Sequence, residues 1–188
     1  MDTDAPTGAR ARTRRAILDA AVEVLAKNPA ASLADIAAAA GVGRTTIHRY
    51  FPERSDLMTG ISAYFLERIE TATMRARLDE GTADAALERL CQEYFELGGV
   101  LTFAFENPQM QDWTDWETET ESDKALERLI ERGHAEGSID ASLPAGWVAD
   151  VLWSLLYSAW QYSRLREQPK HTSLSLCLRT LRKTIGTE

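Results

Sequence analysis

The chain has 188 residues, of which 44% are hydrophobic, and this suits one sizeable domain or a small domain fused to a larger one. Such a composition excludes a wholly disordered chain, and two cysteines, Cys91 and Cys177, are too few for a disulfide framework. The net charge of −8 at first disfavours a nucleic-acid partner. However, residues 1–54 hold eight Lys and Arg against six Asp and Glu, whereas residues 55–188 hold thirteen against twenty-three. A mildly basic head on an acidic body fits nucleic-acid binding at one end.

The N-terminal residues 1–15 lack the apolar run of a signal peptide. The longest apolar stretch, residues 147–160, is too short to span a membrane and contains Asp150. We therefore expect a soluble, cytoplasmic protein without a membrane partner.

Apolar residues recur at helical spacing along most of the chain, and alternating runs of the strand type are missing. This pattern predicts an all-α fold of about nine helices. Residues 1–9 are small and polar, and we expect a disordered arm there. A first helix covers about 10–27 and is stopped by Asn28-Pro29. Ser32 and Asp35 then have the spacing of a capping box at the start of the next helix.

Glycine and proline mark the remaining boundaries. The second helix is expected to end at Gly41, which opens a tight turn, and a third helix runs from near Arg44 to Tyr50. The second half is predicted to hold helices at 52–81, 82–98, 113–136, 144–167 and 172–185, with 100–111 left open.

Residues 32–57 combine a short helix, a glycine turn and a second short helix, which is the pattern of a helix-turn-helix. Ile36 and Ala37 can pack inside, and Ile47 and Phe51 are spaced to anchor the second helix. The side chains left on its first turn and outer face are of types that bond base edges and phosphates: Arg44, Thr45, Thr46, His48 and Arg49.

The same stretch closely resembles the N-terminal domain of the TetR family of bacterial repressors, specifically over about residues 10–70. His48 stands where the family usually has a tyrosine that touches phosphate, and Arg54 stands where lysine is usual. The matching features are Ile17 and Ala20-Ala21 in the first helix, Ser32-Leu33, Ile36-Ala37, Gly41-Val42, Ile47, Phe51-Pro52 and Asp56-Leu57.

The resemblance implies a DNA-binding domain at 10–53 and a ligand-binding and dimerisation domain at 54–188. A palindromic operator would follow from the twofold symmetry of a dimer. For the basic residues of the first helix, a solvated surface is an equal alternative to a minor-groove contact. The residues expected to contact double-stranded operator DNA are Arg12, Arg14, Ser32, Arg44, Thr45, Thr46, His48, Arg49, Tyr50 and Arg54.

The helix expected at 144–167 is apolar on two faces and must be covered on two sides. In the TetR family the last two helices of each subunit form a four-helix bundle, and the pattern here is similar. The alternative is a helix that is central in a monomeric core. The expected homodimer interface consists of Val148, Val151, Leu152, Leu155, Leu174, Cys177, Leu178 and Leu181.

Aromatic residues gather in the second half of the chain. Core packing explains each of them singly, but together they allow a large apolar pocket, and the family resemblance implies one between the fifth, seventh and eighth helices. We expect no cofactor and no metal, but a small-molecule effector of unknown identity bound by Tyr94, Phe95, Phe103, Trp113, Trp116, Trp153, Tyr157 and Trp160.

Residues 106–123 hold seven acidic side chains and two tryptophans but no Lys or Arg. One interpretation is a site for an aromatic or quaternary cation. The other is ordinary helix chemistry, in which acids near the N-terminus and Lys124, Arg128 and Arg132 nearer the C-terminus complement the helix dipole.

Two other classes of protein are disfavoured. The three histidines lie far apart, and no metalloprotease, nucleophile-elbow, P-loop or dinucleotide motif occurs, so an enzyme is not expected. A helical partner-binding protein without DNA contacts would not need Arg44, Arg49 and Arg54. The sequence predicts a ligand-responsive transcriptional repressor that binds operator DNA as a dimer and is released by a small lipophilic effector.

Overall fold

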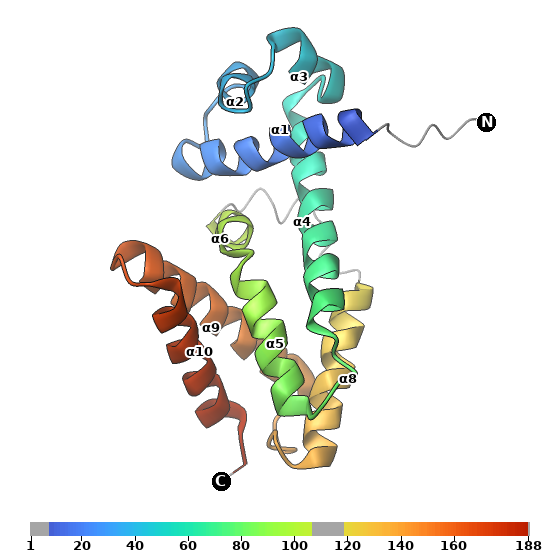
Figure 1. Ribbon diagram of the computed structural model, residues 1–188, viewed down its shortest axis with the longest axis vertical. Helices are drawn as coiled ribbons and strands as arrows, with labels where there is room; N and C mark the ends of the chain where they lie inside the picture. The colour runs from blue at the N-terminus through green and yellow to red at the C-terminus, as the bar shows by residue number, and fades with distance from the viewer. Residues whose placement is uncertain (1–7, 107–118, 188) are drawn as a thin grey trace, which may run out of the picture. The chain divides into compact units, whose positions relative to one another are not determined.

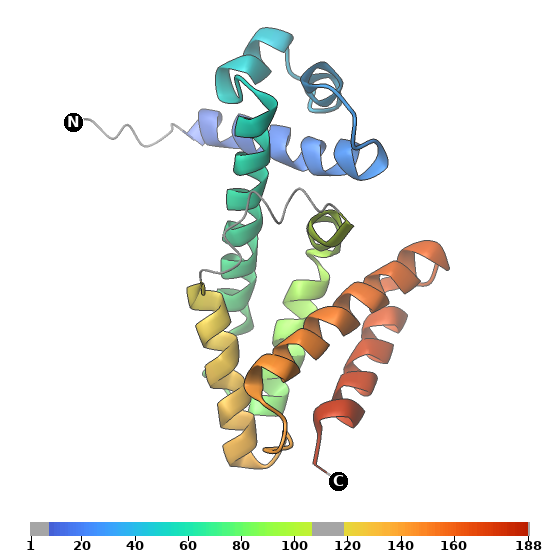
Figure 2. The ribbon, with the colours of Figure 1, turned by 180° about the vertical axis from the view of Figure 1, so that it is seen from behind.

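The computed structural model describes residues 8–106 and 119–187, and every regular element in this part of the chain is an α-helix (Figures 1 and 2). The all-α prediction is confirmed. None of the described helices is long and apolar enough to cross a membrane. The nine helices of the described residues are α1 (Gly8–Lys27), α2 (Leu33–Ala39), α3 (Arg44–Tyr50), α4 (Arg54–Ala76), α5 (Ala83–Phe95), α6 (Gly98–Glu106), α8 (Glu121–Glu136), α9 (Ala145–Leu165) and α10 (Lys170–Ile185).

The described residues form two compact units. The head unit contains residues 8–65 and 103–106, and the body unit contains 66–102 and 119–187. The division falls inside α4 because its first turns bury Leu57 and Ile61 in the core of the head. The domain boundary at 53/54 that the sequence suggested remains a prediction, and the arm at 1–9 lies mostly outside the described residues, although α1 already begins at Gly8.

The core of the head unit forms where α1 to α3 meet the start of α4. On α1 the buried residues recur at helical spacing, and Ile36, Ile47 and Phe51 cover them. Gly60 on α4 allows this packing, because a Cβ atom there would lie 2.6 Å from Cε1 of Phe51. At the same level the Tyr64 hydroxyl donates to the Asp19 carboxylate on α1, with an O–O distance of 2.5 Å.

The turn between α2 and α3 follows from two local features. Ser32 caps α2, since its hydroxyl accepts from the Asp35 amide while the Asp35 carboxylate accepts from the Ser32 amide, as the sequence predicted. Gly41 then adopts a left-handed backbone with φ +67°, which an L side chain would strain. The Val42 amide donates to the Ala37 carbonyl at 2.9 Å and so closes the turn.

The body unit is a bundle of α5, α8, α9 and α10. Figures 1 and 2 both show α9 and α10 running side by side in opposite directions, with α5 beside them. Its interior includes aliphatic residues from every helix, namely Leu90 of α5, Ile130 of α8, Leu152 of α9 and Leu181 of α10. The bundle places the apolar faces of four helices against one another and removes them from water.

Several helix boundaries differ from the sequence prediction, and three of the differences have a clear local cause. The fourth helix ends at Ala76 rather than at Gly81, because Arg77 takes a left-handed φ of 47° and the carbonyls beyond it accept from a side chain of α5. The helix expected from Trp113 begins at Glu121, where Thr120 and Asp123 form a capping box. The last helix begins at Lys170, directly after Pro169.

Candidate functional site

The predicted reading face lies on α3, and most of its side chains are exposed. Arg44, Thr45, His48 and Arg49 are exposed, and Thr46 is half-buried. Ile47 is completely buried on the opposite side of the helix, so α3 is anchored by one face and presents the other. An exposed helix of polar and basic side chains, supported by a second helix, is the arrangement that enters a major groove.

His48 has a defined ring orientation. Its Nδ1 lies 3.2 Å from the Pro52 carbonyl oxygen, which can only accept, so Nδ1 carries the proton of this hydrogen bond. With the hydrogen on Nδ1 used in this way, Nε2 faces solvent as the remaining ring nitrogen and is an acceptor whenever the ring is neutral. Such an atom can take a hydrogen from an adenine or cytosine amino group, whereas the tyrosine usual at this position offers a hydroxyl.

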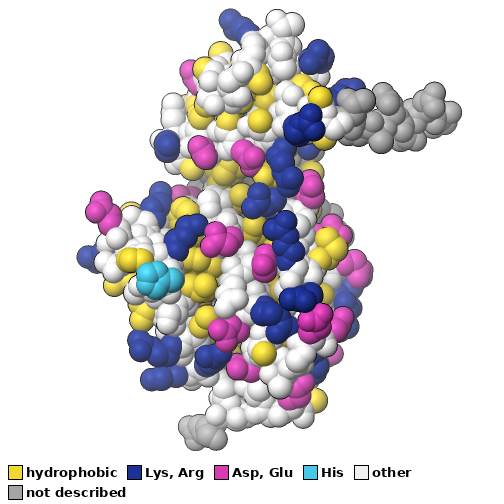
Figure 3. Space-filling view, viewed as in Figure 1, with side chains coloured by type: hydrophobic (Ala, Val, Ile, Leu, Met, Phe, Trp, Pro, Cys, Tyr) yellow, Lys and Arg dark blue, Asp and Glu magenta, His cyan; other side chains and the backbone are white. Residues whose placement is uncertain are grey.

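Arginine side chains stack on the aromatic residues at the edge of α3. The Arg14 guanidinium lies 5.7 Å from the centroid of the Phe51 ring, and the Arg49 guanidinium lies 5.5 Å from that of Tyr50. Arg14 and Tyr50 are half-buried, whereas Arg12 is exposed. The stacking fixes the position of cationic groups beside the reading face, where Figure 3 shows Lys and Arg side chains bordering the head unit.

Arg54 has a structural role that the sequence analysis missed. One terminal guanidinium nitrogen donates to the Ala31 carbonyl and the other donates to the Pro29 carbonyl, each at 2.6 Å. Arg54 therefore ties the start of α4 to the connection between α1 and α2. The phosphate contact expected of Arg54 remains a prediction, since its side chain is also exposed.

Ser32 likewise has a structural role, as a helix cap, besides its predicted contact with DNA. Its hydroxyl donates to the Asp35 carboxylate at 2.7 Å and accepts from the Asp35 amide at 3.2 Å. These hydrogen bonds from Ser32 lower the pKa of Asp35 below its ordinary value. The exposed hydroxyl is held in place by the cap and stays a predicted DNA contact.

In the body unit the predicted ligand-binding residues centre on a pair of stacked rings. Tyr94 of α5 and Trp153 of α9 have centroids 4.6 Å apart and an interplanar angle of 15°. Tyr94 is buried, its hydroxyl lies 2.7 Å from that of Thr73 on α4, and burial raises the pKa of Tyr94 to about 12. Trp153 and Tyr157 are half-buried, and the Tyr157 hydroxyl accepts from Gln161 at 2.9 Å.

The other predicted ligand-binding residues are more scattered. Phe95 is buried on α5, and Phe103 is buried within the head unit. Trp160 packs against Gly98, at the start of α6, so closely that a Cβ atom on Gly98 would overlap its indole ring. Trp113 and Trp116 lie outside the described residues.

Helix α9 carries three apolar stripes rather than two. The stripe that contains Trp153, Tyr157 and Trp160 includes the ring that stacks on α5 and the one that packs at the start of α6. A second stripe faces the interior of the body unit and contains Val148, Leu152, Leu156 and Ala159. A third stripe remains on the surface and contains Trp147, Val151, Leu155, Tyr162 and Leu165, with Ser154 and Ser158 between them.

The predicted dimer interface stays a prediction, and its residues fall on two different stripes. Val148, Leu152, Cys177 and Leu181 are each at most 3% exposed within one chain, so they belong to its own core. The sequence shows a wide apolar arc on α9 but not which part of the arc the same chain covers. The predicted interface residues that keep accessible surface are Val151, Leu155, Leu174 and Leu178.

The acidic segment at 106–123 lies largely outside the described residues. At its end, Asp123 caps α8 together with Thr120, and Glu121 pairs with Lys124 at 2.9 Å. For these two acids the structure favours ordinary helix chemistry. Within the described residues, no group of His, Cys, Asp and Glu is placed to hold a metal ion.

Residues 17–61 match the family described as bacterial regulatory proteins, tetR family. The chain is 37% identical over 181 residues to the HTH-type transcriptional repressor LfrR of Mycolicibacterium smegmatis, and the match covers 96% of this chain and 94% of that repressor. The family match at residues 17–61 includes the whole of α2 and α3, so it coincides with the helix-turn-helix.

Solved structures give the same result. The crystal structure of the TetR-like regulator LfrR from Mycobacterium smegmatis in complex with proflavine has 35% identity and a TM-score of 0.73, and the match covers 96% of this chain and all of that one. A TetR-family regulator from Rhodococcus sp. has 18% identity and a TM-score of 0.72, covering 93% and 98% of the two chains, and shows the fold alone. The relatives are transcriptional regulators rather than enzymes. The chain belongs to the TetR family of bacterial regulatory proteins.

Proposed function

We propose that the protein is a transcriptional repressor that binds a palindromic operator as a homodimer and releases it when a flat aromatic effector binds in the body unit. The observation that carries the DNA half is the exposed, polar and basic face of α3 opposite the buried Ile47. The similarity over most of the chain to a named HTH-type repressor supports repression rather than activation. Such a regulator acts in the cytoplasm, where its operator lies.

The dimer would form through the outer faces of α9 and α10. Trp147 and Leu165 are 58% and 70% exposed, which is unusual for such large apolar side chains on a surface with no further function. Ser154 and Ser158 lie on the same stripe and allow close approach of a second helix. Leu174 and Leu178 extend the patch to α10. An isologous contact of this patch with itself would set the two reading helices about a twofold axis.

The effector would bind beside the stacked rings of Tyr94 and Trp153. Trp153 and Tyr157 keep accessible surface beside the buried Tyr94, and they favour a planar aromatic compound, which can stack on a ring of the same kind. The LfrR regulator was crystallised with proflavine, a flat aromatic cation, and this supports the same class of effector for the present chain. A positive charge on the effector would be attracted to the faces of these aromatic rings as well as to carboxylates.

The test begins with an inverted repeat from the promoter of the gene and its divergent neighbour. The protein is titrated onto this fragment, and then proflavine is added at saturating concentration. We expect tight binding that weakens by about 5- to 150-fold with proflavine, the usual range of coupling between two sites. Binding to unrelated DNA at the same salt concentration is the control. A protein that does not prefer the inverted repeat contradicts the proposal.

The dimer is tested separately. Val151→Glu places a charge in the proposed interface and should give a monomer in light scattering, with loss of operator binding. Glu131→Gln, which alters an exposed residue of α8 away from this patch, is the matched control and should remain dimeric. A Val151→Glu protein that stays dimeric would place the interface elsewhere.

A further inference from the structure

The last turns of α4 are tied to α5 at two points. The Arg89 guanidinium of α5 donates through Nε to the Ala76 carbonyl at 2.8 Å, and through Nη2 to the carbonyls of Arg77 and Glu80 at 2.8 and 2.6 Å. These carbonyls have no partner within a helix, because α4 ends at Ala76. One side chain of α5 therefore holds the C-terminal end of α4.

The second tie lies one turn earlier and is buried. The Thr73 hydroxyl donates to the Ile69 carbonyl at 2.9 Å, so its only hydrogen is used. The 2.7 Å contact with Tyr94 must then be donated by the tyrosine hydroxyl. Thr73 is 8% exposed and Tyr94 is 1% exposed, so neither hydroxyl has water as a ready substitute.

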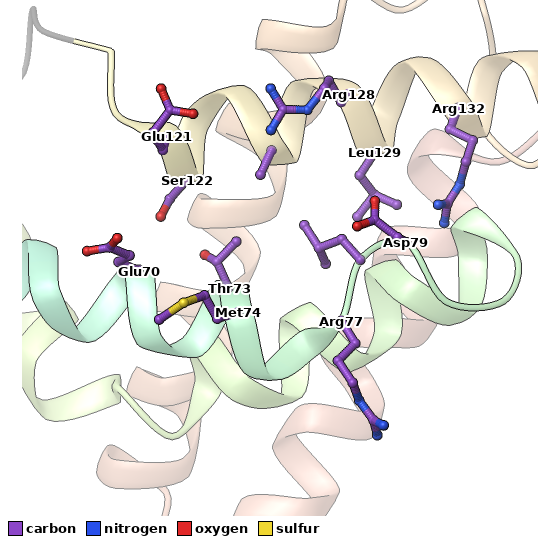
Figure 4. A pocket seen from close by; sticks show the side chains of 12 residues that line it. Glu70, Thr73, Met74, Arg77, Asp79, Glu121, Ser122, Arg128, Leu129 and Arg132 are labelled. Carbon is purple, nitrogen blue, oxygen red and sulfur yellow. The ribbon is translucent and has the colours of Figure 1, made fainter.

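The end of α4 also borders a groove, which Thr73 helps to line. A groove of about 340 Å³ lies between the end of α4 and α8, and Figure 4 shows Leu129 and Ser122 of α8 across from Thr73 and Met74 of α4. Its rims carry both signs of charge, yet no hydrogen bond or ion pair between described residues joins the α4 side to the α8 side. Figure 4 shows the Arg77 side chain directed away from this space.

We propose that Arg89 and Thr73 are positioning residues that make α4 follow α5, and not α8, when an effector binds. The inference rests on the proposed function. An effector that binds beside the stack of Tyr94 and Trp153 and shifts these rings moves α5, and the two ties carry that movement into α4. The groove provides the space in which the end of α4 moves past α8. Because α4 is continuous from Arg54 to Ala76, the movement reaches the head unit along one helix.

The experiment compares operator affinity with and without saturating proflavine, and the ratio of the two dissociation constants measures the coupling. Arg89→Gln should bring this ratio close to one, while the affinities for operator alone and for proflavine alone stay within about threefold of the parent protein. Arg89→Lys should be intermediate, because an ammonium cannot reproduce the fork of a guanidinium. Thr73→Val should lower the ratio and Thr73→Ser should preserve it.

The matched control is Arg128→Gln, the same change on the α8 rim of the same groove, where no hydrogen bond or ion pair joins the arginine to a described residue of α4. It should leave the ratio unchanged. The proposal is overturned if Arg89→Gln keeps the parent ratio, or if Arg128→Gln lowers it equally. Thermal melting of each variant shows that it is folded.

Hydrogen exchange separates this inference from the proposed function. In the absence of effector, Arg89→Gln should raise amide exchange over residues 73–80 and leave residues 122–129 unchanged. If proflavine does not release operator from the parent protein, the proposed function is wrong. The exchange over residues 73–80 still shows whether Arg89 holds the end of α4. Equal exchange in both proteins over 73–80 overturns the tie itself.

Discussion

Gly98 and Trp160 are in such close contact that a Cβ atom on the glycine would lie 1.4 Å from Nε1 of the indole. The contact joins the start of α6 to α9, next to the aromatic stripe where we place the effector. Arg164 covers the same indole, with its guanidinium carbon 5.5 Å from the ring centroid. The position of Trp160 therefore depends on the absence of a side chain at residue 98.

Gly98→Ala is expected to destabilise the body unit. A methyl group in this contact must displace the indole, and such overpacking costs about 1–3 kcal/mol. Urea unfolding measures the loss, and tryptophan emission reports the displaced ring. Gly99→Ala is the matched control, since a Cβ atom there meets nothing within 4 Å and should be neutral or slightly stabilising in a helix. Equal effects of the two changes would contradict the packing argument.

Trp153→Ala is expected to weaken proflavine binding about two- to tenfold, because a lost aromatic stack is worth roughly 0.5–1.5 kcal/mol. Trp153→Phe keeps a ring and should recover most of the affinity. Quenching of proflavine fluorescence on binding provides the measurement. Leu165→Ala changes a residue on the outer stripe of the same helix and should leave proflavine binding unchanged. A Trp153→Ala protein with unaltered affinity would place the effector elsewhere.

Replacing Arg54 and replacing Arg44 should have different effects on stability and on operator binding. Arg54→Ala removes two hydrogen bonds to the carbonyls of Pro29 and Ala31, so it should lower the melting temperature and weaken binding to every operator variant. Arg44→Ala should leave the melting temperature unchanged, cost about 1–3 kcal/mol of binding and relax the preference at one base pair. Melting curves and a panel of single-base operator variants separate the two effects. Identical behaviour of the two variants would show that Arg44 does not read a base.

The buried thiols should be inert at neutral pH. Burial raises the pKa of Cys91 far above its ordinary value, with a smaller contribution from Cys177, and burial raises the pKa of Cys177 to about 11. An aromatic disulfide reagent at pH 8 should therefore label neither thiol until the protein unfolds. Rapid labelling of the folded protein would contradict the burial of both groups.

The same shifts predict how stability depends on pH. In the unfolded chain both thiols ionise near pH 9, whereas in the folded protein they stay protonated to about pH 11 or beyond. The unfolded state thus binds fewer protons above pH 9, and the free energy of unfolding should fall as the pH rises from 9 to 11. Urea unfolding at pH 8 and pH 10 measures this, and Cys177→Ala should reduce the dependence.

The parts of the fold that depend on local patterns could be predicted from the sequence. The cap at Ser32 and the turn at Gly41 each depend on residues within a few positions of one another, and both agree with the structure. The ties made by Arg54 and Arg89 could not be predicted, because their acceptors are backbone carbonyls, which every residue carries. Pairing of a side chain with a distant carbonyl leaves no pattern in one sequence.

The surface of α9 shows a second limit. Its apolar residues cover most of the helix, and their spacing does not reveal which of them meet the same chain and which stay accessible. The packing of α5, α8 and α10 against α9 determines that Val148 and Leu152 are buried in the core, whereas Val151 stays accessible on the outer stripe. The predicted interface therefore mixed two neighbouring stripes.

The three stripes of α9 also restrict how this helix can change in evolution. Inserting or deleting one residue turns everything beyond it by about 100° around the helix axis. On α9 that rotation would send core residues to the surface and aromatic residues into the core at the same time. Length differences among relatives should therefore be confined to the loops before Pro144 and after Leu165, while α9 itself keeps its 21 residues.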